Sequence, residues 1–110
     1  MIKVIIYQNG QGDISSFTVS GHANFARHGE DIVCAGVSAV TFGTVNAIEE
    51  IAGIIPQIAQ GDQGGFLHCE LPENISKESY EKAQILLKGM IVSLQTIERD
   101  YGQYMTITFK

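Results

Sequence analysis

The residues best suited to chemistry lie in one short stretch, where Asp31 and Cys34 open an apolar helical pattern. Asp31 stands where a helix N-cap is expected, so Cys34 falls at the third position of the predicted helix. Free backbone N–H groups and the positive end of the helix dipole stabilise an anion there. The position favours a nucleophilic thiolate, and the same N–H groups could hold the oxyanion of an attacked carbonyl. The Asp31 charge opposes this unless it caps the helix or orients a histidine.

Three histidines are candidates for the base that a cysteine nucleophile requires. His22 follows a predicted strand and would be rigidly placed beside a neighbouring helix. His28 is nearer to Cys34 in the sequence, but it lies in a segment without periodicity. His68 lies within a predicted strand and is expected to fill a face of the sheet. Spacing alone does not choose between His22 and His28.

Ordinary packing explains some of these residues equally well. A free cysteine is among the most buried residue types, so Cys34 is also compatible with an inert core position. Ser38 lies one helical turn beyond Cys34 and could support it, although a helical serine is commonly satisfied by the backbone. The sequence has no CxxC or HxxxH pair, and adjacent strand residues such as His68 and Cys69 point to opposite faces. We therefore expect neither a metal site nor a cofactor.

The elements that position these residues follow from hydrophobic periodicity. A turn rich in Asn and Gly separates the first two apolar segments, which predicts a hairpin. The predicted order is ββαβαβ, an α+β two-layer sandwich in which two helices pack on one face of a mostly antiparallel sheet. The expected strands are residues 2–7, 14–20, 65–71 and 103–109. The expected helices are residues 32–55 and 77–101, with Ser76 as the second N-cap, and residues 57–65 are a connector that overlaps the strand at Gly65. The positions that recur at helical spacing, and are expected to face the core, are Val33, Val37, Val40, Thr44, Ile48, Ile51 and Ile55 in the first helix and Tyr80, Ala83, Leu87, Met90, Leu94, Ile97 and Tyr101 in the second.

Length and composition limit the possible functions. A chain of 110 residues with 45% hydrophobic residues predicts one globular domain, residues 1–110. The net charge of −5 and the lack of a basic run argue against nucleic acid as a direct partner. Glu49 and Glu50 interrupt the longest apolar segment and argue against a membrane span. Two cysteines without a secretory signal suggest free thiols and a cytoplasmic location.

The sequence resembles the ribosomal-processing cysteine protease family, Prp. The matching pieces are "GHA" at residues 21–23, "GEDIVCA" at residues 29–35 and "VSAV" at residues 37–40. They occur in the order and at the spacing found in the family, and the resemblance extends over essentially the whole chain.

The resemblance implies an endopeptidase that removes an N-terminal extension from a large-subunit ribosomal protein. His22 and Cys34 match the family's base and nucleophile. The resemblance also implies a homodimer, and a mobile loop over the substrate cleft with Gly21 and Gly29 as hinges. In this reading Asp31 either orients His22 or caps the helix.

Two other hypotheses remain open from the sequence. The chain could be a non-catalytic acidic dimer, an adaptor that binds a basic ribosomal protein or an assembly factor. It could also be a redox-sensing thiol domain. A Cys34→Ser substitution separates the three, because only the protease loses turnover while it keeps binding.

Overall fold

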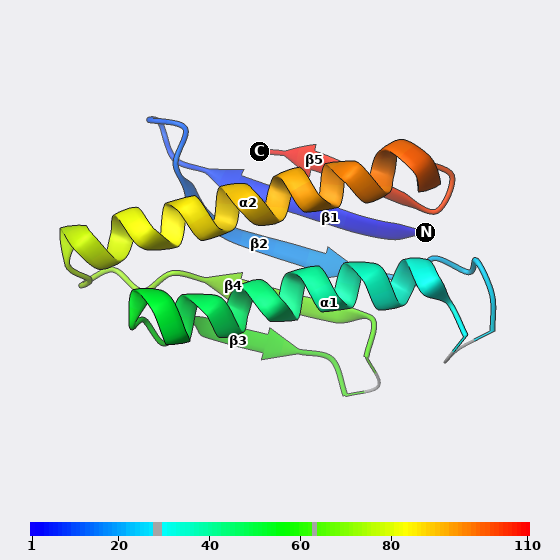
Figure 1. Cartoon of the computed structure of the whole chain (residues 1–110), viewed down its shortest axis with the longest axis horizontal. Helices are drawn as coiled ribbons and strands as arrows, with labels where there is room; N and C mark the ends of the chain where they lie inside the picture. Colours follow the sequence, from blue (N-terminus) through cyan, green and yellow to red (C-terminus); the bar gives the residue numbers. More distant parts are fainter. Residues whose placement is uncertain (28–29, 63) are drawn as a thin grey trace.

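A computed structural model describes residues 1–27, 30–62 and 64–110. Within these residues, five strands form one sheet in the order β3-β4-β2-β1-β5. Figure 1 shows both long helices on the same face of this sheet, so the molecule has two layers. In chain order the elements are β1 (Ile2–Gln8), β2 (Ile14–Ser20), α1 (Ile32–Ala47), the π-helical turn η1 (Ile48–Ala52), β3 (Gln57–Gln60), β4 (Phe66–Glu70), α2 (Lys77–Tyr101) and β5 (Met105–Phe109).

The strand pairings confirm the predicted α+β sandwich. β1 pairs antiparallel with β2, and β4 pairs antiparallel with both β2 and β3. The pair of β1 with β5 is parallel, because α2 carries the chain back across the sheet before β5 begins. The sheet is therefore mostly antiparallel, with its chain termini in neighbouring strands.

One strand was missed by the sequence analysis. β3 lies in the segment predicted to be a connector, and it pairs with β4 at the edge of the sheet. All four of its residues are exposed, so this strand lacks the alternation of buried apolar and exposed polar residues by which a strand is predicted. The observed order is therefore ββαββαβ.

The first helix keeps its predicted start but not its predicted end or its predicted buried face. α1 ends at Ala47, η1 continues to Ala52, and Gly53 follows in the left-handed conformation. Ile51 and Ile55 were expected to be buried, but they are 57% and 82% exposed. The helix is apolar on several faces, so its periodicity cannot identify the side that meets the sheet. Its buried residues are Val33, Val37, Thr41, Val45, Ile48 and Ala52.

The segment Ile32–Ala52 is long and apolar enough to cross a membrane by length and composition alone. Core helices of globular proteins satisfy the same criterion, and this segment packs one face against the sheet and α2. Its length and composition are therefore weak evidence for a membrane span.

The second helix follows its prediction closely. Ser76 caps α2 by accepting a hydrogen bond from the Ser79 N–H at 3.1 Å, and Gly102 follows its last residue. The predicted stripe is buried at Ala83, Leu87, Met90 and Leu94. Gln84 and Ile91 are buried as well and were not predicted.

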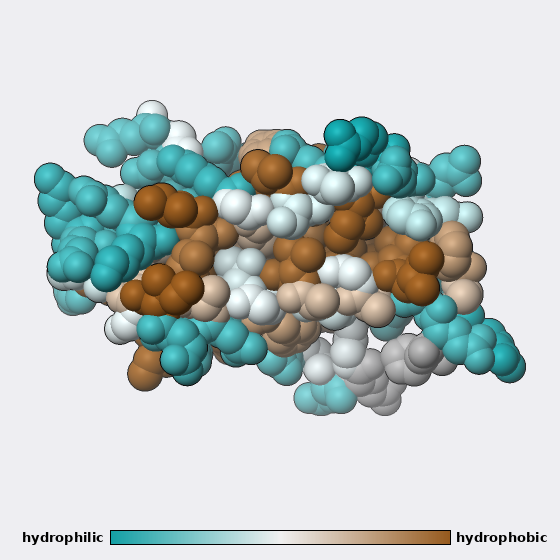
Figure 2. Space-filling view, viewed as in Figure 1, coloured by the Kyte–Doolittle hydropathy of each residue, from teal (hydrophilic) through white to brown (hydrophobic). Residues whose placement is uncertain are grey.

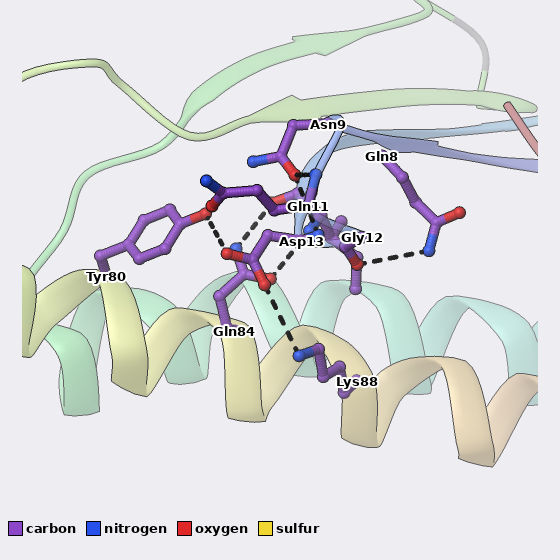
Figure 3. A network of polar contacts seen from close by, with 9 residues as sticks. Gln8, Asn9, Gln11, Gly12, Asp13, Tyr80, Gln84 and Lys88 are labelled. Atoms are coloured by element: carbon purple, nitrogen blue, oxygen red, sulfur yellow. Dashed lines mark hydrogen bonds and ion pairs between the residues drawn. The ribbon is translucent and has the colours of Figure 1, made fainter.

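Buried Gln84 joins α2 to the first hairpin (Figure 3). Its Oε1 accepts a hydrogen bond from the Ile14 N–H at 2.8 Å, and its Nε2 donates to the Ile14 carbonyl at 2.7 Å. Beside it, the Tyr80 hydroxyl donates to Asp13 at 2.7 Å, and Lys88 lies 3.7 Å from the same carboxylate. These contacts fix the helix layer to the sheet at the hairpin end.

Candidate active site

Cys34 occupies the third residue of α1, as predicted, and its side chain is half-buried. Asp31 is the N-cap, with an extended backbone. Its Oδ1 accepts hydrogen bonds from the N–H groups of Val33 and Cys34, both at 3.0 Å. The carboxylate therefore satisfies two of the backbone donors that a helix N-terminus leaves unpaired.

The second oxygen of Asp31 holds the loop that leads from His22 to the helix. Oδ2 accepts hydrogen bonds from the N–H groups of Phe25 at 2.9 Å and Ala26 at 3.4 Å. Burial alone raises the pKa of Asp31, but the four backbone donors outweigh it, so the pKa lies below its ordinary value of 3.8. The structure thus confirms the predicted cap and adds an anchoring role that the sequence did not indicate.

The anchored loop brings its backbone to the sulfur of Cys34. The Ala23 N–H donates to Cys34 Sγ at 3.3 Å. The amides of Val33 and Cys34, by contrast, already donate to Asp31, and the Ala35 N–H donates to the Asp31 carbonyl. The prediction that first-turn amides of the helix hold an oxyanion is therefore wrong for these three groups, because Asp31 occupies them.

His22 lies two residues beyond the end of β2 and lines the same cleft as Cys34. The cleft has a volume of about 750 Å³, and its lining residues come from the end of β2 and the start of α1, among other segments. Ser38 and Phe42 of α1 extend it, and the supporting role of Ser38 stays a prediction. The turn between β3 and β4 forms another wall, with Gly61, Asp62, Gly64 and Gly65.

The other two histidines have different outcomes. His28 lies outside the described residues, as does Gly29, the second predicted hinge. His68 lies on a face of the sheet, as predicted, and because it alternates with the buried Leu67 and Cys69, that face is the one away from the helices. Its ring contacts Thr18 Oγ1 at 2.9 Å and a Glu70 carboxylate oxygen at 3.2 Å.

The glycine at the other predicted hinge has a clear structural role. Gly21 has φ +86°, and a side chain there would overlap the carbonyl oxygen of Met1. Its N–H donates to the Gly65 carbonyl at 2.8 Å. Close approach of the chain to β1 therefore requires glycine at this position.

Cys69 provides an internal contrast to Cys34. Both cysteines are free, but Cys69 is only 2% exposed. Burial, together with the negative charge of Glu49, raises the pKa of the Cys69 thiol to about 12. Across the part of the chain that is described, no three His, Cys, Asp or Glu side chains gather as a metal site.

A cysteine at a helix N-terminus and a histidine in one open cleft form the arrangement typical of cysteine proteases. The sequence comparison agrees with this class, because the profile described as cysteine protease Prp matches residues 1–106. The chain belongs to the cysteine protease Prp family and is a cysteine protease.

Similar proteins support this assignment along the whole chain. The ribosomal processing cysteine protease Prp of Bacillus subtilis is 50% identical over 108 residues, covering 98% of this chain and 96% of that protein. The Staphylococcus aureus protein of the same name is 41% identical over 110 residues and all of both chains. A crystal structure of the S. aureus protease with a covalently linked product peptide has a TM-score of 0.90 at 40% identity, covering all of both chains.

Proposed function

We propose that this protease removes the N-terminal extension of a large-subunit ribosomal protein, with Cys34 as the nucleophile and His22 as the general base. The observation that carries the proposal is the hydrogen bond from the Ala23 N–H to Cys34 Sγ. Because Ala23 follows His22 directly, this bond holds the backbone of the base next to the sulfur. Relatives named as ribosomal processing proteases support the choice of substrate.

The reaction follows from the two side chains. His22 accepts the Cys34 proton as the sulfur bonds to the scissile carbonyl carbon. The C–N bond then breaks, and protonated His22 gives its proton to the leaving amine. Water, deprotonated by His22, attacks the thioester, which releases the extension as a carboxylic acid and restores Cys34. The covalent product peptide in the S. aureus structure fits a reaction that passes through a covalent intermediate.

The Ala23 N–H is the proposed oxyanion donor. It already points at the sulfur, so the oxygen of a carbonyl bonded to that sulfur would lie within its reach. The helix amides near Cys34 serve Asp31 instead. Asp31 thereby supports catalysis indirectly, by fixing both the helix that carries the nucleophile and the loop that carries the donor.

Cleavage of a ribosomal protein precursor tests the proposal. The purified protease is mixed with a ribosomal protein that carries its N-terminal extension, and mass spectrometry measures the cleaved fraction. Cys34→Ser should abolish cleavage and retain binding, and His22→Ala should lower kcat/KM by about 10²–10⁴-fold. Cys69→Ala and His68→Ala are the matched controls and should cleave normally. Unchanged cleavage by Cys34→Ser would refute the proposed nucleophile, and binding without cleavage by the unmodified protein would favour an adaptor.

The same proposal includes substrate gating by the loop after Gly21. Phe25 packs edge-on against Tyr101 and Tyr104, with ring centroids 5.8 and 5.1 Å apart, and yet it remains 40% exposed. Such limited burial offsets little of the entropy of ordering a loop. Even with the two hydrogen bonds to Asp31, amide exchange at residues 24–27 should therefore be faster than in α1 in the free protease, and slower with a substrate peptide. Protection in both states would exclude gating.

We also propose that the protein is a homodimer joined through its helical face. Figure 2 shows apolar residues gathered over both helices. A groove lies between α1 and α2, and Ile85 and Val92 of α2 are exposed beside it. Replacing both with glutamate should give a monomer by light scattering, whereas Thr108→Glu, on β5, should not. A monomeric unmodified protein would overturn this point. The groove is lined by Val40, Gly43, Thr44 and Ala47 of α1 and by Leu86, Gly89, Met90 and Ser93 of α2.

A further inference from the structure

Two consecutive glycines in the turn before β4 have the same backbone conformation but different surroundings. Gly64 has φ +77° and Gly65 has φ +75°, both in the left-handed region that disfavours side chains. We infer that Gly65 is a positioning residue for the base His22, because its bare α-carbon leaves the space in which the imidazole lies. This inference rests on the proposed role of His22.

The contacts of the two glycines differ sharply. A Cβ added at Gly65 would lie 2.7 Å from His22 Nε2 and 3.1 Å from Cε1, whereas a Cβ at Gly64 would meet nothing within 4 Å. The imidazole therefore packs directly against the backbone of Gly65. Ordinary contacts of a Cβ begin at 3.4 Å, so a methyl group at Gly65 would push the ring away by at least 0.7 Å.

The backbone of Gly65 also fixes the chain that carries the histidine. Its carbonyl accepts the Gly21 N–H at 2.8 Å. This bond follows directly on the pairing of Ser20 with Phe66, so it extends the ladder between β2 and β4 by one step. Gly65 consequently contacts the ring of His22 and holds the residue before it. A displacement here would act on the base without touching Cys34 or the helix.

The kinetic effect of that displacement can be stated in advance. A shift of about 1 Å in a catalytic group can lower the rate by about 100-fold. Gly65→Ala should therefore lower kcat by about 100-fold, with KM nearly unchanged. Gly64→Ala is the matched comparison, since it has the same backbone strain without the clash. Gly64 also lines the cleft, so KM is measured separately, and kcat should fall much less than in Gly65→Ala. Equal losses of kcat in the two variants would overturn the inference.

A thermal-stability cycle tests the contact independently of protease activity. A side chain at either glycine should lower Tm through backbone strain, by about 4–8 °C in a domain of this size. Gly65→Ala should lower it further, because the methyl group also meets the ring. In a His22→Ala background that additional loss should vanish, leaving a Tm shift equal to that of Gly64→Ala.

The outcomes separate the inference from the proposed function. An additional Tm loss that persists without the His22 ring would overturn the positioning role, even if the protease cleaves normally. If the additional Tm loss vanishes without the ring, but cleavage does not depend on His22, then the contact between Gly65 and His22 stands and the catalytic role of His22 is refuted. Should Gly65→Ala fail to fold, the double variant with His22→Ala should still fold, and its failure to do so would also overturn the inference.

Discussion

The two thiols of this protease should differ greatly in their reactivity. We expect iodoacetamide to modify Cys34 in the folded protein and to leave Cys69 intact. Cys34 lies in the open cleft at the start of α1, whereas Cys69 is buried between the sheet and the helices. The difference follows from access to the sulfur and from the raised pKa of Cys69, because only the thiolate is alkylated.

The magnitude for Cys69 can be worked from its surroundings. Its pKa is raised from an ordinary 9.0 to about 12. At any pH below 9.0, three units of pKa correspond to about 1000-fold less thiolate than in an ordinary thiol. With 2% exposure, even that small fraction is shielded from the reagent. Cys69 should therefore react at least about 1000-fold more slowly than a cysteine in an unfolded peptide, and only through opening of the fold.

Peptide mapping by mass spectrometry measures both rates in one sample. The protein is treated with limiting reagent at several pH values between about 6 and 9, and each cysteine peptide is quantified. The Cys34→Ser variant should show almost no labelling until guanidinium unfolds it, after which Cys69 should react fully. Labelling of both cysteines at similar rates in the folded protein would refute the contrast between an accessible nucleophile and a buried thiol.

Further outcomes are expected for substitutions at three residues. Asp31→Asn keeps one oxygen for the helix cap, but its amide nitrogen cannot accept the N–H groups of Phe25 and Ala26. It should therefore lower kcat with little change in Tm, whereas Asp31→Ala should lower both. Because folding lowers the Asp31 pKa, its carboxylate stabilises the fold above pH 3.8 and loses this effect as the pH falls below it; Asp31→Asn should flatten the Tm profile there. Gln84→Leu leaves the buried N–H and carbonyl of Ile14 without their partner, so it should lower the free energy of unfolding by about 2–5 kcal/mol in denaturant titrations. An unchanged unfolding midpoint would contradict this role of Gln84. His68→Ala should leave kcat unchanged, and a large loss would place a second histidine in the reaction.

Local signals in the sequence predicted the helix that carries Cys34. An aspartate three residues before a cysteine, at the start of an apolar helical pattern, correctly indicated the cap and the third helical position. Ser76 and Gly102 marked the ends of α2 in the same way. These predictions succeeded because capping and helix termination depend on residues within a few positions of one another.

Contacts between distant segments could not be predicted in this way. Gln84 lies 70 positions from Ile14, and a buried glutamine in a helix has no local pattern that names its partner. The turn at Gly64 and Gly65 was treated as part of a connector, since nothing in the nearby sequence places it against His22. Its density of glycines signals an unusual backbone, but only the pairing of β2 with β4 shows which side chain uses the space.

The position of His22 relative to Cys34 depends both on local capping and on contacts between distant segments. Asp31 reads locally as a cap, and a cap requires only one of its two oxygens. The second oxygen is available to the loop because the first satisfies two helix amides at once. One carboxylate therefore fixes the helix that carries Cys34 and the loop that follows His22, while Gly65 fixes the ring from the opposite strand. The family resemblance could name Cys34 and His22 as the proposed reacting residues. The contacts that bring their segments together involve Asp31, whose second role appears only when the loop has folded.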